Sequence, residues 1–212
     1  MHLIGALIIY QKFEKMSISI LTIDNLIFHF INFIGDIMSK KLFKYEVAGF
    51  ILVGIFGTLN HFLFELFDSN VIIALFCPVN ESVWEHLKLL FFPYFLWTGI
   101  EYFFLKEQRN YFSSKIKGVV FGMIFIVTFF YTYSGVSGNV NTFIDILSFF
   151  IGVAISFIIS YEFMRNGKSG SRLQENVSLF IFIFISAVFF IFTFAPPLIP
   201  LSEDPQRFTY GI

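Results

Sequence analysis

Cysteine is almost missing from this sequence, since Cys77 is the single one among 212 residues. One cysteine cannot form an intrachain disulfide, and zinc motifs built from several cysteines are excluded as well. Charged residues are also scarce, at 14%, and the formal net charge of −1 leaves no excess of basic groups. A nucleic-acid partner would need a basic face or stripe, so the composition argues against one.

The sequence is instead rich in apolar residues, which make up 57% of the chain and give it a mean hydropathy of +0.78. Such values are typical of membrane proteins. A bilayer core about 30 Å thick is crossed by roughly 20 apolar residues in a helix, which satisfies its own backbone hydrogen bonds. We therefore predict an all-α, polytopic membrane helical bundle with five transmembrane helices. The five segments are residues 46–67, 80–105, 116–133, 140–164 and 177–195.

The composition divides the chain into an N-terminal extension (residues 1–37), the transmembrane bundle (38–195) and an external proline-rich tail (196–212). Polar residues recur every three or four positions in the extension, which predicts an amphipathic helix on the membrane surface. A sixth span is one alternative, and a translation start at Met38 is another. The tail either ends the chain in disorder or folds back over the bundle.

The orientation in the membrane is predicted from the basic residues, which stay on the cytoplasmic side. Of the 14 lysine and arginine residues, only Lys88 and Arg207 fall on the side opposite to the rest. This pattern predicts a bacterial cytoplasmic membrane protein with a cytoplasmic N-terminus and an external C-terminus. It also places Cys77 in an external loop, where a membrane-impermeant thiol reagent should reach it provided that the loop is accessible.

Ionisable groups inside a membrane cost roughly 2.5–3.5 kcal/mol each, so they tend to face the bundle interior and to mark function. Two of the predicted spans carry small and polar residues at spacings of three and four. We expect the two stripes to face each other or a shared cavity near the external side. They comprise Gly54, Gly57, Thr58, His61, Glu65 and Asp68 on the first span, and Asn141, Asp145, Ser148, Gly152 and Ser156 on the fourth.

A dense polar motif, PVNESVWEHLK, opens the second span. Asn80 is a suitable N-cap and Glu81 suits the first turn of a helix, so ordinary helix chemistry explains both. Glu85 and His86 then lie deeper, where capping does not explain them. Glu101 and Glu162 lie near the cytoplasmic helix ends, and we expect both to reach water.

Two histidines and several carboxylates therefore gather at the external side. We predict that His61, Glu65, Glu85 and His86 bind a divalent transition metal such as zinc, which favours imidazole and carboxylate ligands. A further carboxylate, Glu81 or Asp145, would activate water, which gives the hypothesis of a metal-dependent membrane hydrolase. The spacings HxxxE and ExxxEH are not established zinc signatures, so the motif alone does not decide this.

Two other functions stay open. In the first, His61 with Glu65 and Glu85 with Lys88 are structural pairs. The chain is then a non-enzymatic membrane protein whose partners are lipids, a second copy or another membrane protein. In the second, the polar groups form an ion or proton pathway of a small transporter, although no internal repeat supports one.

The motif at residues 78–88, together with the tail residues Pro197, Pro200, Asp204, Pro205, Tyr210 and Gly211, resembles a known family. It is similar to small multi-pass membrane proteins of Firmicutes that are classed as a domain of unknown function. The resemblance covers residues 38–212. It implies a multi-pass helical fold and a membrane location, and it brings no catalytic assignment.

Overall fold

Helices make up the regular structure of this protein. The computed structural model describes residues 40–167, 170–205 and 207–212. Within these residues no β-strand occurs, and a single isolated bridge joins Glu203 and Tyr210. The prediction of an all-α bundle is confirmed. The helices are Lys40–Leu66, α2 (Val71–Ala74), α3 (Val83–Leu105), α4 (Tyr111–Ser137), α5 (Thr142–Asn166) and α6 (Arg172–Phe194).

The chain forms two units, Met1–Leu42 and Phe43–Ile212. The amphipathic helix predicted within residues 1–37, its sixth-span alternative and the Met38 start all lie outside the described residues. The architecture that follows is that of the second unit.

Among the residues that the structure describes, four helices are long and apolar enough to cross a membrane: Lys40–Leu66, α4, α5 and α6. Their outward side chains are largely apolar and exposed, such as Phe62 at 59% and Phe180 at 65%, as expected for a surface that lipid covers. These helices fit an integral membrane protein.

Helix α3, the remaining predicted span, is not among those four although its 23 residues reach about 35 Å. It contains Glu85, Lys88 and Glu101, all of them buried. A crossing by α3 therefore stays a prediction.

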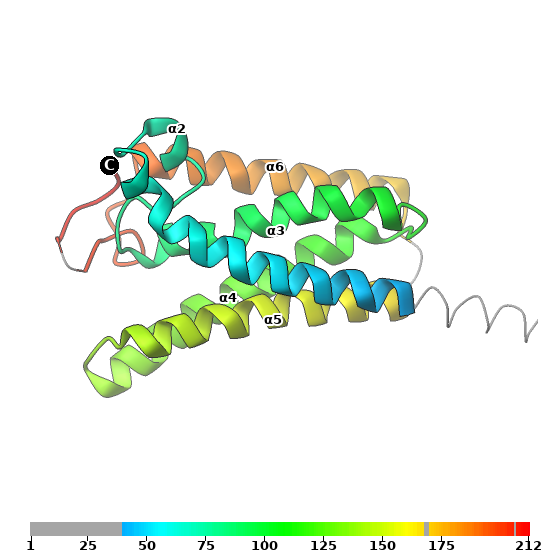
Figure 1. Cartoon of the computed structure of the whole chain (residues 1–212), viewed down its shortest axis with the longest axis horizontal. Helices are drawn as coiled ribbons and strands as arrows, with labels where there is room; N and C mark the ends of the chain where they lie inside the picture. The colour runs from blue at the N-terminus through cyan, green and yellow to red at the C-terminus, as the bar shows by residue number, and fades with distance from the viewer. Residues whose placement is uncertain (1–39, 168–169, 206) are drawn as a thin grey trace, which may run out of the picture. The chain divides into compact units, whose positions relative to one another are not determined.

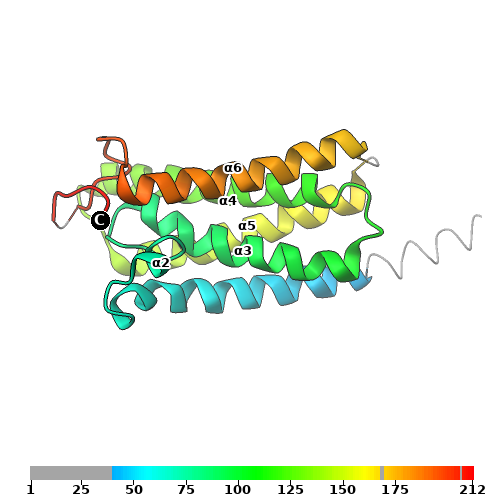
Figure 2. The same cartoon turned by 90° about the horizontal axis from the view of Figure 1, so that it is seen from above.

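Figures 1 and 2 show how the helices of this unit are arranged. In both views α4 and α5 run side by side, and α6 lies along α3 and α4. The α3–α4 connection and the α5–α6 connection lie at one end, which we call the loop end. Helix α2 and residues 196–205 and 207–212 lie at the other, which we call the tail end. The positions that sequence reasoning placed at the external side belong to the tail end.

Small residues set which helices approach closely. A Cβ atom at Gly122 of α4 would lie 2.6 Å from the carbonyl oxygen of Gly152 on α5, so these two backbones are nearly in contact. The stripe on α5 thus faces α4, so the two stripes do not face each other, and the alternative of a shared cavity stays a prediction. Gly54 of helix Lys40–Leu66 instead meets the ring of Phe150, because the small residues of α5 are already used against α4.

The first turn of α4 is capped from a distant helix. Asn110 makes no side-chain cap bond, and the amides of Phe112 and Ser113 donate to the Glu175 carboxylate of α6 at 2.7 and 3.2 Å. A carboxylate at a helix N-terminus satisfies amides that the helix itself leaves free. This contact ties α4 to α6 at the loop end.

We predict that Gly57→Ala destabilises the bundle, because the added Cβ would lie 2.5 Å from the carbonyl oxygen of Leu89 on α3. Overpacking of this kind typically costs about 1–3 kcal/mol. Gly99→Ala is the matched control, since nothing lies within 4 Å of a Cβ there. Thermal unfolding in detergent should show a lower Tm for Gly57→Ala and an unchanged or higher Tm for Gly99→Ala. Equal Tm values for the two variants would contradict the close approach.

Candidate functional site

The polar motif forms the loop before α3 and its first turns. Helix α3 begins at Val83, and its N-cap is Ser82, whose Oγ accepts a hydrogen bond from the Glu85 amide at 3.2 Å. Asn80 lies outside the helix and accepts from the Ser82 amide at 3.0 Å, so its assignment as N-cap is wrong. Ser82 and Glu85 have the S-x-x-E spacing of a capping box, a signal that sequence reasoning missed. Glu85 is therefore a first-turn residue.

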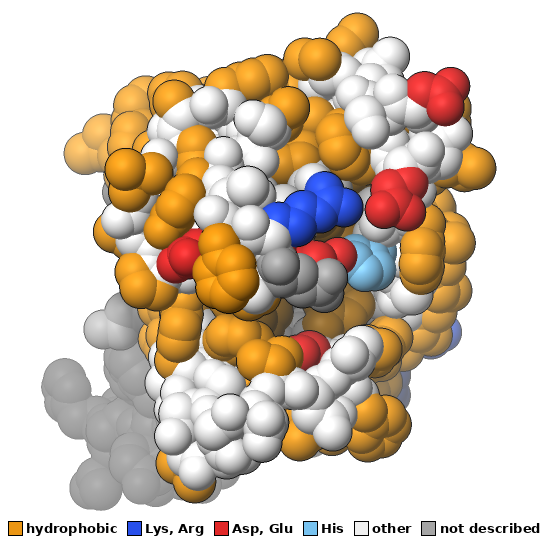
Figure 3. All heavy atoms as spheres, turned by 90° about the vertical axis from the view of Figure 1, so that its left-hand side faces the viewer, with side chains coloured by type: hydrophobic (Ala, Val, Ile, Leu, Met, Phe, Trp, Pro, Cys, Tyr) orange, Lys and Arg blue, Asp and Glu red, His pale blue; other side chains and the backbone are white. Residues whose placement is uncertain are grey.

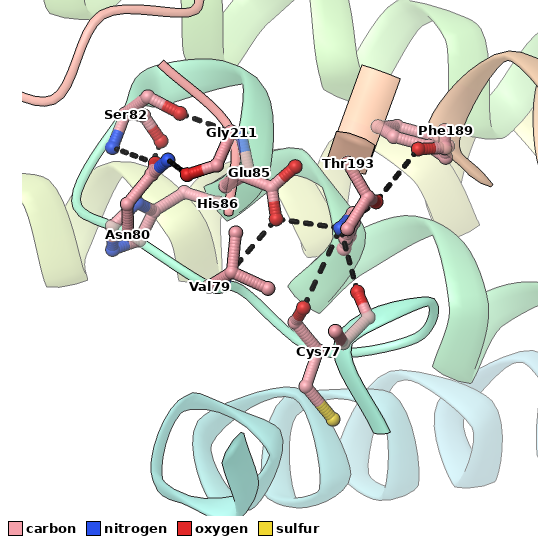
Figure 4. A network of polar contacts seen from close by, with 11 residues as sticks. Cys77, Val79, Asn80, Ser82, Glu85, His86, Phe189, Thr193 and Gly211 are labelled. Carbon is pink, nitrogen blue, oxygen red and sulfur yellow. Dashed lines mark hydrogen bonds and ion pairs between the residues drawn. The ribbon is translucent and has the colours of Figure 1, made fainter. Parts of the chain in front are cut away.

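Glu85 forms a buried ion pair with Lys88. The Lys88 Nζ lies 2.5 Å from Glu85 Oε2, 2.7 Å from Thr193 Oγ1 and 2.9 Å from the Ala74 carbonyl oxygen. The Val79 amide donates to the same Glu85 oxygen at 3.1 Å (Figure 4). Side-chain exposure is 0% for Lys88 and 2% for Glu85. This is the ion pair that the structural alternative proposed. Together with Thr193 and Ala74, Glu85 provides an acceptor for each of the three ammonium protons of Lys88.

The structure brings His61, Glu81 and His86 together at the tail end. Each offers one ligand atom, and the three atoms all lie within 4.8 Å of one another. His86 Nε2 is 3.5 Å from Glu81 Oε2, and the two imidazole rings have centroids 5.2 Å apart. The group is partly open, with side-chain exposures of 31% for His86 and 42% for Glu81. We call these three residues the histidine–carboxylate group.

The hydrogen bonds around this group leave ring nitrogens available to a ligand. His86 Nδ1 lies 2.9 Å from the Ser82 carbonyl oxygen, which can only accept, so Nδ1 carries the proton and Nε2 offers its lone pair. Among the described residues, His61 Nδ1 is buried and has no hydrogen-bond partner. The 3.5 Å between His86 and Glu81 is close to the roughly 3.3 Å that separates two ligand atoms on one tetrahedral zinc. The group therefore has the donor types and spacing of a metal site.

The other residues predicted for the site lie elsewhere. Glu65 is exposed one turn beyond His61 and is not part of the histidine–carboxylate group. Glu85 is held by Lys88, and Asp145 accepts a hydrogen bond from the Tyr133 hydroxyl of α4. The structure thus groups two of the four predicted ligands with Glu81, which was predicted as a base. The ligand set itself stays a prediction.

The tail folds back onto the motif. The Asn80 side-chain amide donates to the Gly211 carbonyl oxygen at 3.1 Å, and the Trp84 amide donates to that of Leu201 at 2.9 Å. The Glu81 amide lies 3.4 Å from Asp204 Oδ2. Of the two alternatives for the tail, folding back is the observed one. Figure 3 looks onto this end, where acidic side chains and a histidine reach the surface between apolar patches.

Cys77 lies beneath this surface. Its side chain is buried, and burial raises the pKa of the thiol to about 11, although the Lys88 ammonium partly opposes that increase. The accessible loop on which labelling by an impermeant reagent depends is therefore absent. A position in a loop suggested exposure, whereas the Cys77 side chain is buried inside the protein.

Sequence reasoning also missed a second charged cluster, at the loop end. Glu101 was expected to reach water, yet it is fully buried and pairs with Lys115. Lys115 was counted as a loop residue, yet it lies inside α4 and also pairs with Glu46. The spacing of Tyr94, Thr98 and Glu101 was a usable signal, since steps of four and three place them on one helical face.

Comparison with known proteins places the chain in a family. A model of the family of unknown function DUF6512 matches residues 47–212. The chain belongs to this family. No curated protein and no solved structure matches it. The match covers the helices and the tail, and it assigns no activity to any of the residues described above.

We predict that Lys88→Met strongly destabilises the protein, because it leaves the Glu85 carboxylate buried without a cation. Removing one partner of a buried pair typically costs about 3–5 kcal/mol. The Tm in detergent should fall sharply, and the double variant Glu85→Gln/Lys88→Met should recover part of the loss. Lys106→Met, at an exposed position, is the control. A Tm change no larger than that of Lys106→Met would refute the importance of the pair.

Proposed function

We propose that this protein is an integral membrane protein that binds a divalent transition metal, zinc being the best match, through His61, Glu81 and His86. The observation behind the proposal is the convergence of three ligand atoms within 4.8 Å from two separate parts of the chain. Two imidazoles and one carboxylate form a ligand set that zinc uses in hydrolytic enzymes. The free Nε2 of His86 and the unpartnered Nδ1 of His61 support it.

We further propose that the site is catalytic rather than structural. Structural zinc sites are closed by four protein ligands, whereas three protein ligands leave a position for water or substrate. Zinc in such a site acts as a Lewis acid and makes bound water a nucleophile at neutral pH. The partial exposure of His86 and Glu81 gives solvent access to the group. Asp145 has no part in this proposal, since Tyr133 holds it.

We assign the loop end to the cytoplasmic side of a bacterial membrane and the tail end to the external side. Lys106, Arg109 and Arg165 lie in or beside the two connections at the loop end, which supports this orientation. Lys115 and Lys117 lie inside α4 and no longer count as loop charges, but removing these two residues leaves the direction of the asymmetry unchanged. The histidine–carboxylate group then faces the outside of the cell.

A second candidate is a non-enzymatic membrane protein in which the same group is structural. Two contacts favour it: His86 already bonds to the Ser82 carbonyl oxygen, and its other ring nitrogen lies 3.5 Å from Glu81. In this case the side chains connect the motif to helix Lys40–Leu66 and need no ion. The two candidates differ in whether metal is bound at all.

We predict about one zinc ion per chain in the full-length protein purified in detergent after growth with zinc, measured by elemental analysis. His61→Ala, His86→Ala and Glu81→Gln should each lose most of it, because each removes a ligand. Glu65→Gln is the matched control, a carboxylate at the same end outside the group, and it should keep its metal. Added zinc should also raise the Tm of the wild type, since a ligand stabilises the state that binds it.

Two results would decide against this site. A wild type without stoichiometric metal would favour the structural candidate, in which His86→Ala lowers only the Tm. Metal that is kept in Glu81→Gln and lost in Glu65→Gln would favour the ligand set expected from the sequence.

The orientation is tested with single cysteines in a Cys77→Ala background. Ser69→Cys, exposed at the tail end, should react with an impermeant maleimide in intact cells. Glu107→Cys, exposed at the loop end, should react only after permeabilisation. In the wild-type protein, Cys77 should stay unreactive in intact and in permeabilised cells. A buried thiol with a pKa of about 11 has little thiolate at neutral pH. The opposite pattern for the two introduced cysteines would reverse the orientation.

A further inference from the structure

Two carboxylates and one lysine meet inside the bundle near the loop end. Lys115 Nζ of α4 lies 2.8 Å from Glu46 Oε1 of helix Lys40–Leu66 and also contacts Glu101 Oε2 of α3. Exposure is 3% for Glu46 and 0% for Glu101 and Lys115. If all three side chains were ionised, this loop-end cluster would hold a net charge of −1 in an apolar interior. An uncompensated buried charge is far more costly than a neutral polar group.

The hydrogen bonds at Tyr111 point to one additional proton. The Tyr111 hydroxyl oxygen lies 2.7 Å from the Thr98 carbonyl oxygen and 2.9 Å from Glu101 Oε2. A phenol has one proton to donate, and a carbonyl oxygen can only accept. If Tyr111 donates to Thr98, then Glu101 must supply the proton between its own oxygen and that of Tyr111. The hydrogen bonds at Tyr111 and the net charge of the cluster therefore both indicate one additional proton.

Lys115 contacts one oxygen of each acid, and the other oxygen of each acid has no partner among the described residues. The Lys115 ammonium and the Ser160 hydroxyl of α5 donate to Glu46 Oε1 at 2.8 and 3.0 Å. Lys115 also contacts Glu101 Oε2, the oxygen that lies beside the Tyr111 hydroxyl. Among the described residues, Glu46 Oε2 and Glu101 Oε1 have no hydrogen-bond partner. Tyr111 is therefore the contact that assigns the proton to Glu101.

Tyr94 adds a further ionisable group to the cluster. Its side chain is fully buried, and its hydroxyl interacts with the Ser160 side chain. Lys115 Nζ lies 5.5 Å from the centre of its ring. A Cβ atom at Gly118 would lie 2.8 Å from that hydroxyl, so the glycine leaves it room. The ionisable groups facing the cluster are then Glu46, Tyr94, Glu101, Tyr111 and Lys115, and α5 contributes Ser160.

We propose that the loop-end cluster is a proton-binding site, which holds one proton on Glu101 between its carboxyl oxygen and the Tyr111 hydroxyl. With that proton, anionic Glu46, cationic Lys115 and neutral Glu101 sum to zero charge. Without it the cluster carries −1 at the point where four helices meet. The site therefore gives the bundle a proton-dependent contact. It is independent of the metal proposed at the tail end.

Difference infrared spectroscopy of the full-length protein in lipid tests the proposal, because a protonated carboxylic acid has a C=O stretch separate from that of a carboxylate. At neutral pH the wild type should show this band, and Glu101→Gln should remove it. Glu46→Gln should remove it too, since Glu101 then becomes the sole counterion of Lys115. Lys115→Met should roughly double it, because both acids must then be neutral. Glu162→Gln, at an exposed position, is the matched control and should leave the band unchanged.

Tyr111→Phe separates a proton site from a merely structural one. It should keep the band and shift its frequency, since the acid loses its hydrogen-bond acceptor. A wild type without the band, or a band that survives in Glu101→Gln, would overturn the proposal. If Lys115→Met does not fold, Glu46→Gln and Tyr111→Phe still decide the question.

Discussion

A charge inside an apolar bundle has to be neutralised where it lies, and this constraint organises both ends of the molecule. At the tail end, Lys88 of α3 pairs with Glu85 of the same helix. It also donates to the Thr193 hydroxyl of α6 and to the carbonyl oxygen of Ala74 in α2. One ammonium group thus connects three parts of the chain. At the loop end Lys115 has the same role between two glutamates.

Helix α3 carries the acidic partners of both lysines, which explains its unusual character. It is not among the four candidate spans, and many of its residues are buried. A helix with charges near both of its ends is best accommodated inside the bundle, where other helices supply the partners. Its neighbours can then remain apolar toward lipid. The charged residues of α3 therefore favour its position inside the bundle.

The two candidate sites differ in access, and access decides which ligand each can take. The histidine–carboxylate group is partly exposed, so an ion can reach it from water and lose its hydration shell there. The loop-end cluster is closed on all sides by side chains, and a proton needs no room of its own. The proposed metal site thus has the solvent access that an ion requires. The proposed proton site does not need such access.

Hydropathy and length located the five long helices, with each end within six residues of the structure, and four of the five are long and apolar enough to cross a bilayer. The start of α3 was also readable, since Ser82 and Glu85 have the spacing of a capping box. The family resemblance pointed to a family of unknown function, and residues 47–212 match one.

Only the tertiary structure decided which charged groups meet. Glu85 and His86 are neighbours in sequence, but about 100° separates them around the helix, so Lys88 takes the first and His61 lies beside the second. Glu81, outside the helix, reaches His86, whereas Glu65 does not join the group. Glu46, Glu101 and Lys115 come from three helices whose rotation about their own axes is set by packing. A sequence specifies each apolar face, but the pairing of polar groups between helices depends on how all those faces pack at once.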